Sequence, residues 1–322
     1  MYLGTDLLAA WSLNLEFGVA GVANLAYIVV IAAGAYTYAV LTLGPSSGNG
    51  GFQHYILGFR LPFALTVIAA ALVGAAVGAL IRVSGLKRLR QDYQGMVMLV
   101  VSLMAATVVG ADGGLFNGQA GLSLVSNPFS GSGSAGGDWT YVGVVALACV
   151  VGYLLLRRFT GGPMGRTLRA MRDDEHAAAA IGRSVVNLRL LAQAVGGAFG
   201  GVRGALLVGL IGGWSPSSWA YPETLALLTA IIVGGMGNNV GVSIGTFVVY
   251  LLLLQGVQFL PAIASHPGLT EAFGWMILGV TTVAFVWLRP QGVFPERRPR
   301  FGRPRADPAG GSGPGLSDSI RA

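Results

Sequence analysis

Apolar stretches separated by short polar connections run along most of the chain. Eight of them are candidate membrane spans, at residues 24–43, 63–81, 96–109, 139–156, 190–211, 224–235, 240–260 and 272–288. Stretches 63–81 and 139–156 are uncharged and come close to the ~20 residues that a helix needs to cross a ~30 Å hydrocarbon core. A shorter stretch at 7–17 indicates a re-entrant or tilted piece. The pattern predicts an all-α polytopic membrane protein with roughly eight transmembrane segments, some of them short or broken.

Glycine interrupts several of these stretches. Gly196, Gly200 and Gly204 recur every four residues and therefore line one face of the predicted helix. Small residues at this spacing let two helix backbones approach closely, although a general richness of membrane helices in glycine would also produce them. A second glycine cluster at 234–241 breaks an apolar stretch and predicts a helix–loop–helix or a tight turn.

Positive charge is confined to three parts of the chain. Loop 82–90, loop 157–189 and the tail from residue 289 contain every Lys and Arg except Arg60 and Arg203. Because cytoplasmic loops carry an excess of Lys and Arg, these three parts are predicted to face the cytoplasm. Residues 295–322 have the composition of a disordered basic tail, which leaves 1–294 as the transmembrane domain. The net charge of +7 therefore reflects topology and does not point to nucleic acid.

A charged island at 166–182 lies inside the second basic loop. Arginines surround the acidic run 173–175, an alanine run follows, and Gly182 is a helix stop. One interpretation is an ordinary basic loop. The other is a single cytoplasmic helix that docks on a soluble partner.

The residues needed for chemistry within this chain are missing or scattered. Cys149 is the only cysteine and the three histidines are far apart in sequence, so neither a disulfide nor a metal site is expected. No Gly-x-x-x-x-Gly-Lys-[Ser/Thr] phosphate loop is present. Ser215, Ser217 and Ser218 have no neighbouring base, so no catalytic residue is expected.

Five stretches, taken together and in order, resemble the membrane permease subunit of branched-chain amino-acid ABC importers. They are Ser12-Leu13-Asn14-Leu15 with Gly18, Gly21 and Gly34-Ala35-Tyr36; Leu89-Arg90 with Tyr93; the island from Gly165-Arg166 to Gly182; Ser215-Pro216-Ser217-Ser218 through Gly234-Gly235-Met236-Gly237; and Leu278-Gly279 with Leu288-Arg289-Pro290-Gln291-Gly292. The resemblance covers roughly residues 6–294.

The resemblance implies a transport subunit of a bacterial or archaeal cytoplasmic membrane, surrounded by lipid and without a cofactor of its own. A second, homologous permease subunit, two cytoplasmic ATPase subunits that use ATP and Mg²⁺, and an extracytoplasmic solute-binding protein are the implied partners. The island is similar to the family's coupling loop, with Arg172 and Glu175 expected as polar contacts to the ATPase. The implied coupling residues are Gly165, Arg166, Ala170, Arg172, Asp174, Glu175, Ala177, Ala178 and Gly182.

Polar residues at broken segments are the candidates for the solute path: Asn14, Asn24, Arg203, Asn238 and Asn239. A buried Arg203 would need a carboxylate from the solute or from Glu16, unless the side chain snorkels to the outer interface. Arg203 and the run 93–99 depart from the family pattern, which leaves urea, an amide or another amino acid open as the solute. A stand-alone secondary transporter and a membrane scaffold are the competing classes.

Overall fold

The computed structural model describes residues 1–45, 53–84, 91–125, 129, 134–219, 222–256 and 267–296. These residues are helical apart from loops and two isolated bridges, Tyr55 with Phe116 and Leu122 with Trp214. Lys87, Arg88 and Arg90 and the predicted tail beyond residue 296 lie outside the described residues, so the predictions about them stay predictions.

The helices follow the predicted spans. In chain order they are α1 (Tyr2–Asn14) with the π-helix η1 (Leu15–Val19), α2 (Tyr27–Thr42), α3 (Phe63–Ser84), α4 (Gln91–Ala111), α5 (Gly113–Phe116), η3 (Gly118–Ala120), α6 (Ser134–Gly161), α7 (Pro163–Asp173), α8 (Glu175–Ala180), α9 (Val185–Ile211), η5 (Pro216–Ser218), α10 (Pro222–Gly234), α11 (Asn239–Thr246) with the π-helix η6 (Phe247–Gln255), and α12 (Pro267–Leu288). The all-α class is confirmed. The first piece runs from Tyr2 to Val19 and is longer than the predicted 7–17.

Length and composition allow four of these helices to cross a membrane, at Phe63–Arg82, Tyr93–Ala111, Trp139–Gly161 and Val185–Ile211. Shorter apolar helices lie at Tyr27–Thr42, Asn239–Gln255 and Ala272–Leu288. The outward faces of the long helices are apolar, with Leu72 67% and Leu80 67% exposed on α3 and Val283 69% exposed on α12. Exposed apolar side chains on this scale suit lipid or a second subunit rather than water, so the protein is an integral membrane protein.

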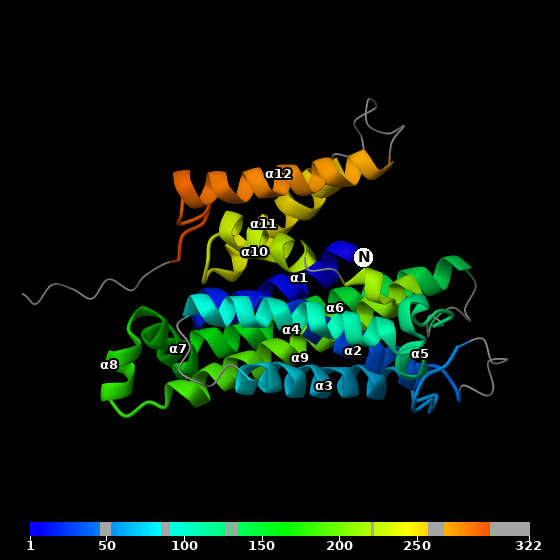
Figure 1. The fold of residues 1–322 in the computed structure, drawn as a ribbon. Helices are drawn as coiled ribbons and strands as arrows, with labels where there is room; N and C mark the ends of the chain where they lie inside the picture. Colours follow the sequence, from blue (N-terminus) through cyan, green and yellow to red (C-terminus); the bar gives the residue numbers. More distant parts are fainter. Residues whose placement is uncertain are drawn as a thin grey trace, which may run out of the picture.

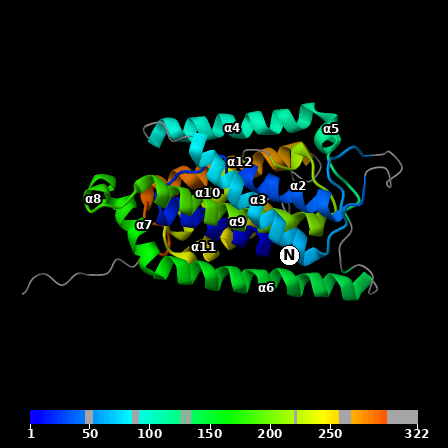
Figure 2. The ribbon, with the colours of Figure 1, turned by 90° about the horizontal axis from the view of Figure 1, so that it is seen from below.

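Helix α9 is the centre of the bundle (Figures 1 and 2). It packs on α1, α2 and α3, whereas α10, α11 and α12 form a layer beside α1. In Figure 2, α4 and α6 run along opposite flanks. Helices α7 and α8 lie at one end, called here the α7 end, and α5 lies at the other, called the α5 end.

The α9 glycines face neighbouring helices of the same chain. A Cβ at Gly204 would collide with the backbone of α2 at Ile31 and Ala35, whereas one at Gly200 would meet the side chains of Tyr27 and Val30. A Cβ at Gly196 would collide with Glu16. Gly197 and Gly201 approach the α3 backbone in the same way. Glycine at these positions therefore allows α9 to lie against both α2 and α3.

Candidate functional site

The charged island forms two helices, so the prediction of one helix over 166–182 is wrong. Asp174 interrupts it with an extended backbone (φ −152°, ψ 108°). Its carboxylate accepts hydrogen bonds from the backbone N–H groups of His176 (2.9 Å) and Ala177 (3.0 Å), which caps α8. Gly182 follows α8 at φ +79°, a backbone conformation that favours glycine. The break gives the island a bend that sequence periodicity did not indicate.

One face of each island helix is buried against the bundle. On α7 the buried residues are Gly165, Leu168 and Met171, and on α8 the buried residue is Ala178. Arg166, Ala170 and Ala177, which the sequence assigned to ATPase coupling, lie on the exposed side. Pro163 at the first turn of α7 fixes the start of the helix, directly after the Gly161–Gly162 link from α6.

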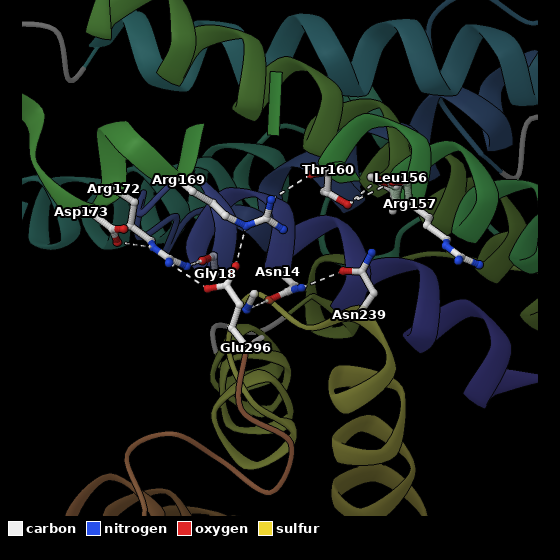
Figure 3. Close-up of polar contacts among 11 residues, drawn as sticks. Asn14, Gly18, Leu156, Arg157, Thr160, Arg169, Arg172, Asp173, Asn239 and Glu296 are labelled. Carbon is white, nitrogen blue, oxygen red and sulfur yellow. Dashed lines mark hydrogen bonds and ion pairs between the residues drawn. The ribbon is translucent and has the colours of Figure 1, made fainter. Parts of the chain in front are cut away.

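Two arginines of α7 hold the island to the rest of the protein (Figure 3). Arg172 donates hydrogen bonds to the Gly18 carbonyl in η1 and, at 2.8 Å, to Glu296 Oε2. Arg169 donates to Glu296 Oε1 (2.5 Å) and to the Thr160 carbonyl (2.9 Å). This set of Arg169, Arg172, Glu296 and Gly18 is called the inner cluster. Arg172, which was expected to contact the ATPase, is thus engaged within its own chain.

Glu296 is carried to the inner cluster by the turn that follows α12. Gly292 adopts φ +71°, and its N–H bonds the Arg289 carbonyl at 2.9 Å, which closes the turn. Val293 N–H then bonds the Val233 carbonyl (2.9 Å) and Phe294 N–H the Gly234 carbonyl (3.1 Å). The segment after α12 therefore lies on the end of α10, and the inner cluster joins α7 to both η1 and α10.

Three of the predicted path residues lie at the α10–α11 turn, and two of them, Asn14 and Asn239, fasten it to α1. Asn14 donates from Nδ2 to Asn239 Oδ1 (2.9 Å) and accepts from the Gly237 N–H (2.9 Å). Asn238 caps α11 through Val240 N–H at 3.1 Å and Gly241 N–H at 3.4 Å. The glycine cluster thus forms the helix–loop–helix that its sequence predicted.

Asn24 lies apart from these three and binds Glu16. Its Nδ2 donates to Glu16 Oε2 at 2.8 Å, and its Oδ1 accepts from the Ala26 N–H at 3.1 Å. Glu16 is fully buried in the π-helix η1, and its other oxygen, Oε1, has no hydrogen-bond partner among the described residues. The glycine at 196 leaves the room that this carboxylate occupies.

Arg203 is buried in an ion cluster near the α5 end. Its NH2 group bonds Asp6 Oδ1 at 2.9 Å and also Glu223, and its side chain is 2% exposed. The expectations that Glu16 is its partner and that the guanidinium snorkels are therefore wrong. This set of Arg203, Asp6 and Glu223 is called the outer cluster. Asp6 lies inside α1, and Glu223 lies in the first turn of α10. Grouping charged residues by the predicted side of the membrane would have been the signal for this pairing.

Two cavities are partly lined by α4. The larger, about 470 Å³, is bounded mainly by apolar residues of α2, α3 and α4 towards the α5 end. The smaller, about 320 Å³, is lined by the 17–25 segment, the start of α4 and Arg189 near the α7 end. None of the five residues predicted for the solute path lines either of these two cavities.

Residues that could hold a metal or perform catalysis do not gather in the part of the chain that the structure describes. Over those residues no group of three or more His, Cys, Asp or Glu side chains could hold a metal ion. Ser215 Oγ shares hydrogen bonds with Ser217 Oγ (2.8 Å) and Ser218 Oγ (3.0 Å) in the short turn η5, as expected for a turn.

Comparison with known proteins agrees with this architecture. The probable branched-chain amino acid transport permease protein LivM of Methanocaldococcus jannaschii is 27% identical over an alignment of 328 positions, and the alignment covers 92% of each chain. The high-affinity branched-chain amino acid transport system permease proteins LivM of Salmonella typhimurium and Escherichia coli are 28% and 27% identical over alignments of 312 positions, which cover 90% of this chain and 67% of theirs. No solved structure matches the chain.

A family model described as branched-chain amino acid transport system / permease component matches residues 2–286. The match spans every helix from α1 almost to the end of α12. The chain therefore belongs to the family of permease components of branched-chain amino acid transport systems.

Proposed function

We propose that the chain is the transmembrane permease subunit of an ABC importer for branched-chain or related amino acids. A second permease subunit completes the pore, two ATPase subunits hydrolyse ATP with Mg²⁺ on the cytoplasmic side, and an extracytoplasmic binding protein delivers the solute. The α7 end then faces the cytoplasm of a bacterial or archaeal cell, in agreement with its arginines. The chain itself catalyses no reaction.

The observation that carries the proposal is the inner cluster. A basic loop whose arginines only set the orientation of the protein in the membrane would need no fixed contacts with the membrane spans. Here Arg172 reaches η1, and Arg169 and Arg172 share Glu296, which lies on the end of α10. Movement of α7 by a docked ATPase would therefore be passed to η1 through Arg172, and to the end of α10 through Glu296 and the segment that carries it.

The exposed side of the island supplies the docking surface. Ile181, just after α8, is 74% exposed, and Ala177 beside it is exposed as well. A large apolar side chain standing clear of the bundle, with small residues around it, is suited to a groove on a soluble partner. Arg166 and Ala170 extend this surface along α7. Glu175 contributes indirectly, because it holds Arg189 of α9 at 2.5 Å.

Co-purification with the ATPase subunits tests the docking surface. Ile181→Asp places a charge where an apolar contact is proposed, so the ATPase subunits should be lost while the permease stays inserted. Leu124→Asp is the matched control, since Leu124 is 77% exposed in a loop near the α5 end. Retention of the ATPase by the Ile181 variant, or equal loss in both variants, would contradict the proposed surface.

Glu16 favours one other class, an ion-coupled secondary transporter. A buried carboxylate with an unpartnered oxygen, as found here among the described residues, is the kind of group that binds a proton or cation in such proteins. The two classes separate in proteoliposomes without ATPase subunits. Leucine uptake driven by a proton or sodium gradient in that preparation would support the secondary transporter, and uptake that needs ATP and the partner subunits would support the importer.

A further inference from the structure

The two cavities along α4 differ in chemistry, and apolar side chains lie between their walls. A small apolar cluster of Ala26, Val30, Ile81 and Met98, with Leu25 and Val29 against it, lies between the segments that line them. Met98 comes from α4, one turn beyond Gln94, and is 2% exposed. The larger cavity has apolar walls, whereas the smaller one is partly polar. We call the smaller one the inner cavity.

Hydrogen-bond donors without partners line the inner cavity. Gln94 is 6% exposed, and its Nε2 has no partner among the described residues. Arg189 uses NH2 for Glu175, while its Nε is buried and also unpartnered over the same residues. An unpaired donor buried away from water costs about 1–3 kcal/mol, so an acceptor in the inner cavity that reaches both groups would be favoured there.

The charge around the inner cavity is positive. Arg82, at the end of α3, is 4% exposed and lies close enough to Arg189 and Glu175 to interact electrostatically with both. Two guanidinium groups and one carboxylate leave a local charge of about +1, which attracts an anion. Phe17, Val22 and Leu25 supply apolar wall on the side of the 17–25 segment.

We propose that the inner cavity binds a small amino acid by its carboxylate, with Gln94 and Arg189 as donors and the apolar wall against its side chain. The proposal rests on the proposed function and names the place from which the solute leaves for the cytoplasm. A volume of about 320 Å³ accommodates a molecule of this size and is at the lower end of the range for ligand pockets.

The inner cavity also touches the coupling helices. A Cβ at Gly21, which lines the cavity, would meet the Arg172 side chain of α7, and Arg189 holds Glu175 of α8. The walls of the cavity therefore rest on both helices of the island. Movement of the island would reshape the cavity, which is what release of the solute on the ATPase cycle requires.

The test is direct binding of radiolabelled L-leucine to the full permease–ATPase complex in phosphatidylcholine nanodiscs, without binding protein or ATP. Gln94→Glu replaces a donor by a second carboxylate and should weaken leucine binding by about tenfold or more. Gln94→Met removes the donor at similar volume and should weaken leucine binding less.

Gln119→Glu, at an exposed glutamine near the α5 end, is the control and should leave leucine binding unchanged. Leucinamide, which lacks the carboxylate, should compete at least about tenfold less well than leucine.

Equal leucine affinity in wild type and both Gln94 variants would overturn the proposal. The proposal would also be overturned if leucinamide bound with the same affinity as leucine. It would be overturned as well if added phosphatidylglycerol abolished leucine binding, because a lipid headgroup would then be the occupant. Each variant must retain its ATPase subunits for its result to count. ATP-driven uptake by the wild type is measured in parallel with the binding protein. Uptake without Gln94-dependent binding refutes the site alone, and binding without ATP-driven uptake refutes the proposed function.

Discussion

The outer and inner clusters are opposite in composition. The outer cluster sets two carboxylates around one guanidinium, and the inner cluster sets two guanidinium groups around one carboxylate. Arg203 is 2% exposed at its side chain, whereas Arg169 and Arg172 are 29% and 20% exposed. Both clusters join helices that are distant in sequence. Their arginines differ in how much water reaches them.

Burial decides what each cluster contributes. Breaking a buried ion pair leaves an uncompensated charge and costs about 3–5 kcal/mol, whereas pairs open to water contribute about 0–1 kcal/mol. The outer cluster should therefore matter for folding and assembly. The inner cluster should contribute less to the free energy of unfolding. Its proposed role is the mechanical link between α7, η1 and the end of α10.

The largest expected effect is that of Arg203→Met. It leaves Asp6 and Glu223 facing each other without a cation, and we expect a loss of about 3–5 kcal/mol in stability. Asp6→Asn should cost less, because Glu223 still pairs with Arg203. Thermal unfolding in detergent measures both. Arg183→Met, at an exposed arginine in the α8–α9 link, should leave the midpoint unchanged. A similar midpoint for all three variants would contradict the structural role of the outer cluster.

A smaller loss is expected from the glycines of α9, which runs between the two clusters. Gly204→Ala forces a Cβ against the α2 backbone, so the helices must separate, and overpacking of this kind costs about 1–3 kcal/mol. Gly200→Ala meets only the ends of Tyr27 and Val30, at 3.1 Å and 3.2 Å, and should cost less because these side chains can shift. The two unfolding midpoints give the answer. Equal midpoints would mean that this face is not tightly packed on α2.

The smallest effect on stability is expected for Glu296→Gln. Glu296 is 16% exposed and its arginine partners are 29% and 20% exposed, so loss of its charge should cost less than loss of the 2%-exposed Arg203 charge. Asp173→Asn is the control, because Asp173 is 61% exposed beside the same Arg172. Both midpoints should lie close to the wild-type value. A fall for Glu296→Gln as large as that for Arg203→Met would erase the proposed difference between the clusters.

The spans could be predicted because their signal is local. Apolar runs and the absence of charge identified α3, α6 and α9 without knowledge of any neighbour. The break at Asp174 was missed because alanine and charged residues favour one continuous helix, and the cap is seen only when the Asp174 carboxylate meets its two N–H groups.

The partners in the clusters depend on contacts between distant parts of the chain. Arg203 was singled out from the sequence, but its partners Asp6 and Glu223 are 197 and 20 residues away along the chain. Glu16 was expected as its partner because it lies within a predicted apolar stretch. Glu296 was assigned to a tail, since composition does not show that the Gly292 turn carries it back to α7. Gln94 was noticed only as a departure from the family pattern. Its place in a cavity follows from the packing of the 17–25 segment and Arg189 of α9 against the start of α4.

The central claim is that the inner cluster transmits movement of the coupling helices to the spans. The most direct measurement is the number of leucine molecules taken up per ATP hydrolysed, in proteoliposomes that contain the permease, ATPase and binding-protein partners. For Glu296→Gln we predict that hydrolysis continues while uptake per ATP falls by about tenfold, equivalent to about 1.4 kcal/mol of coupling. Asp173→Asn should keep the wild-type ratio. An unchanged ratio for Glu296→Gln, with the protein folded and the ATPase bound, would contradict the account.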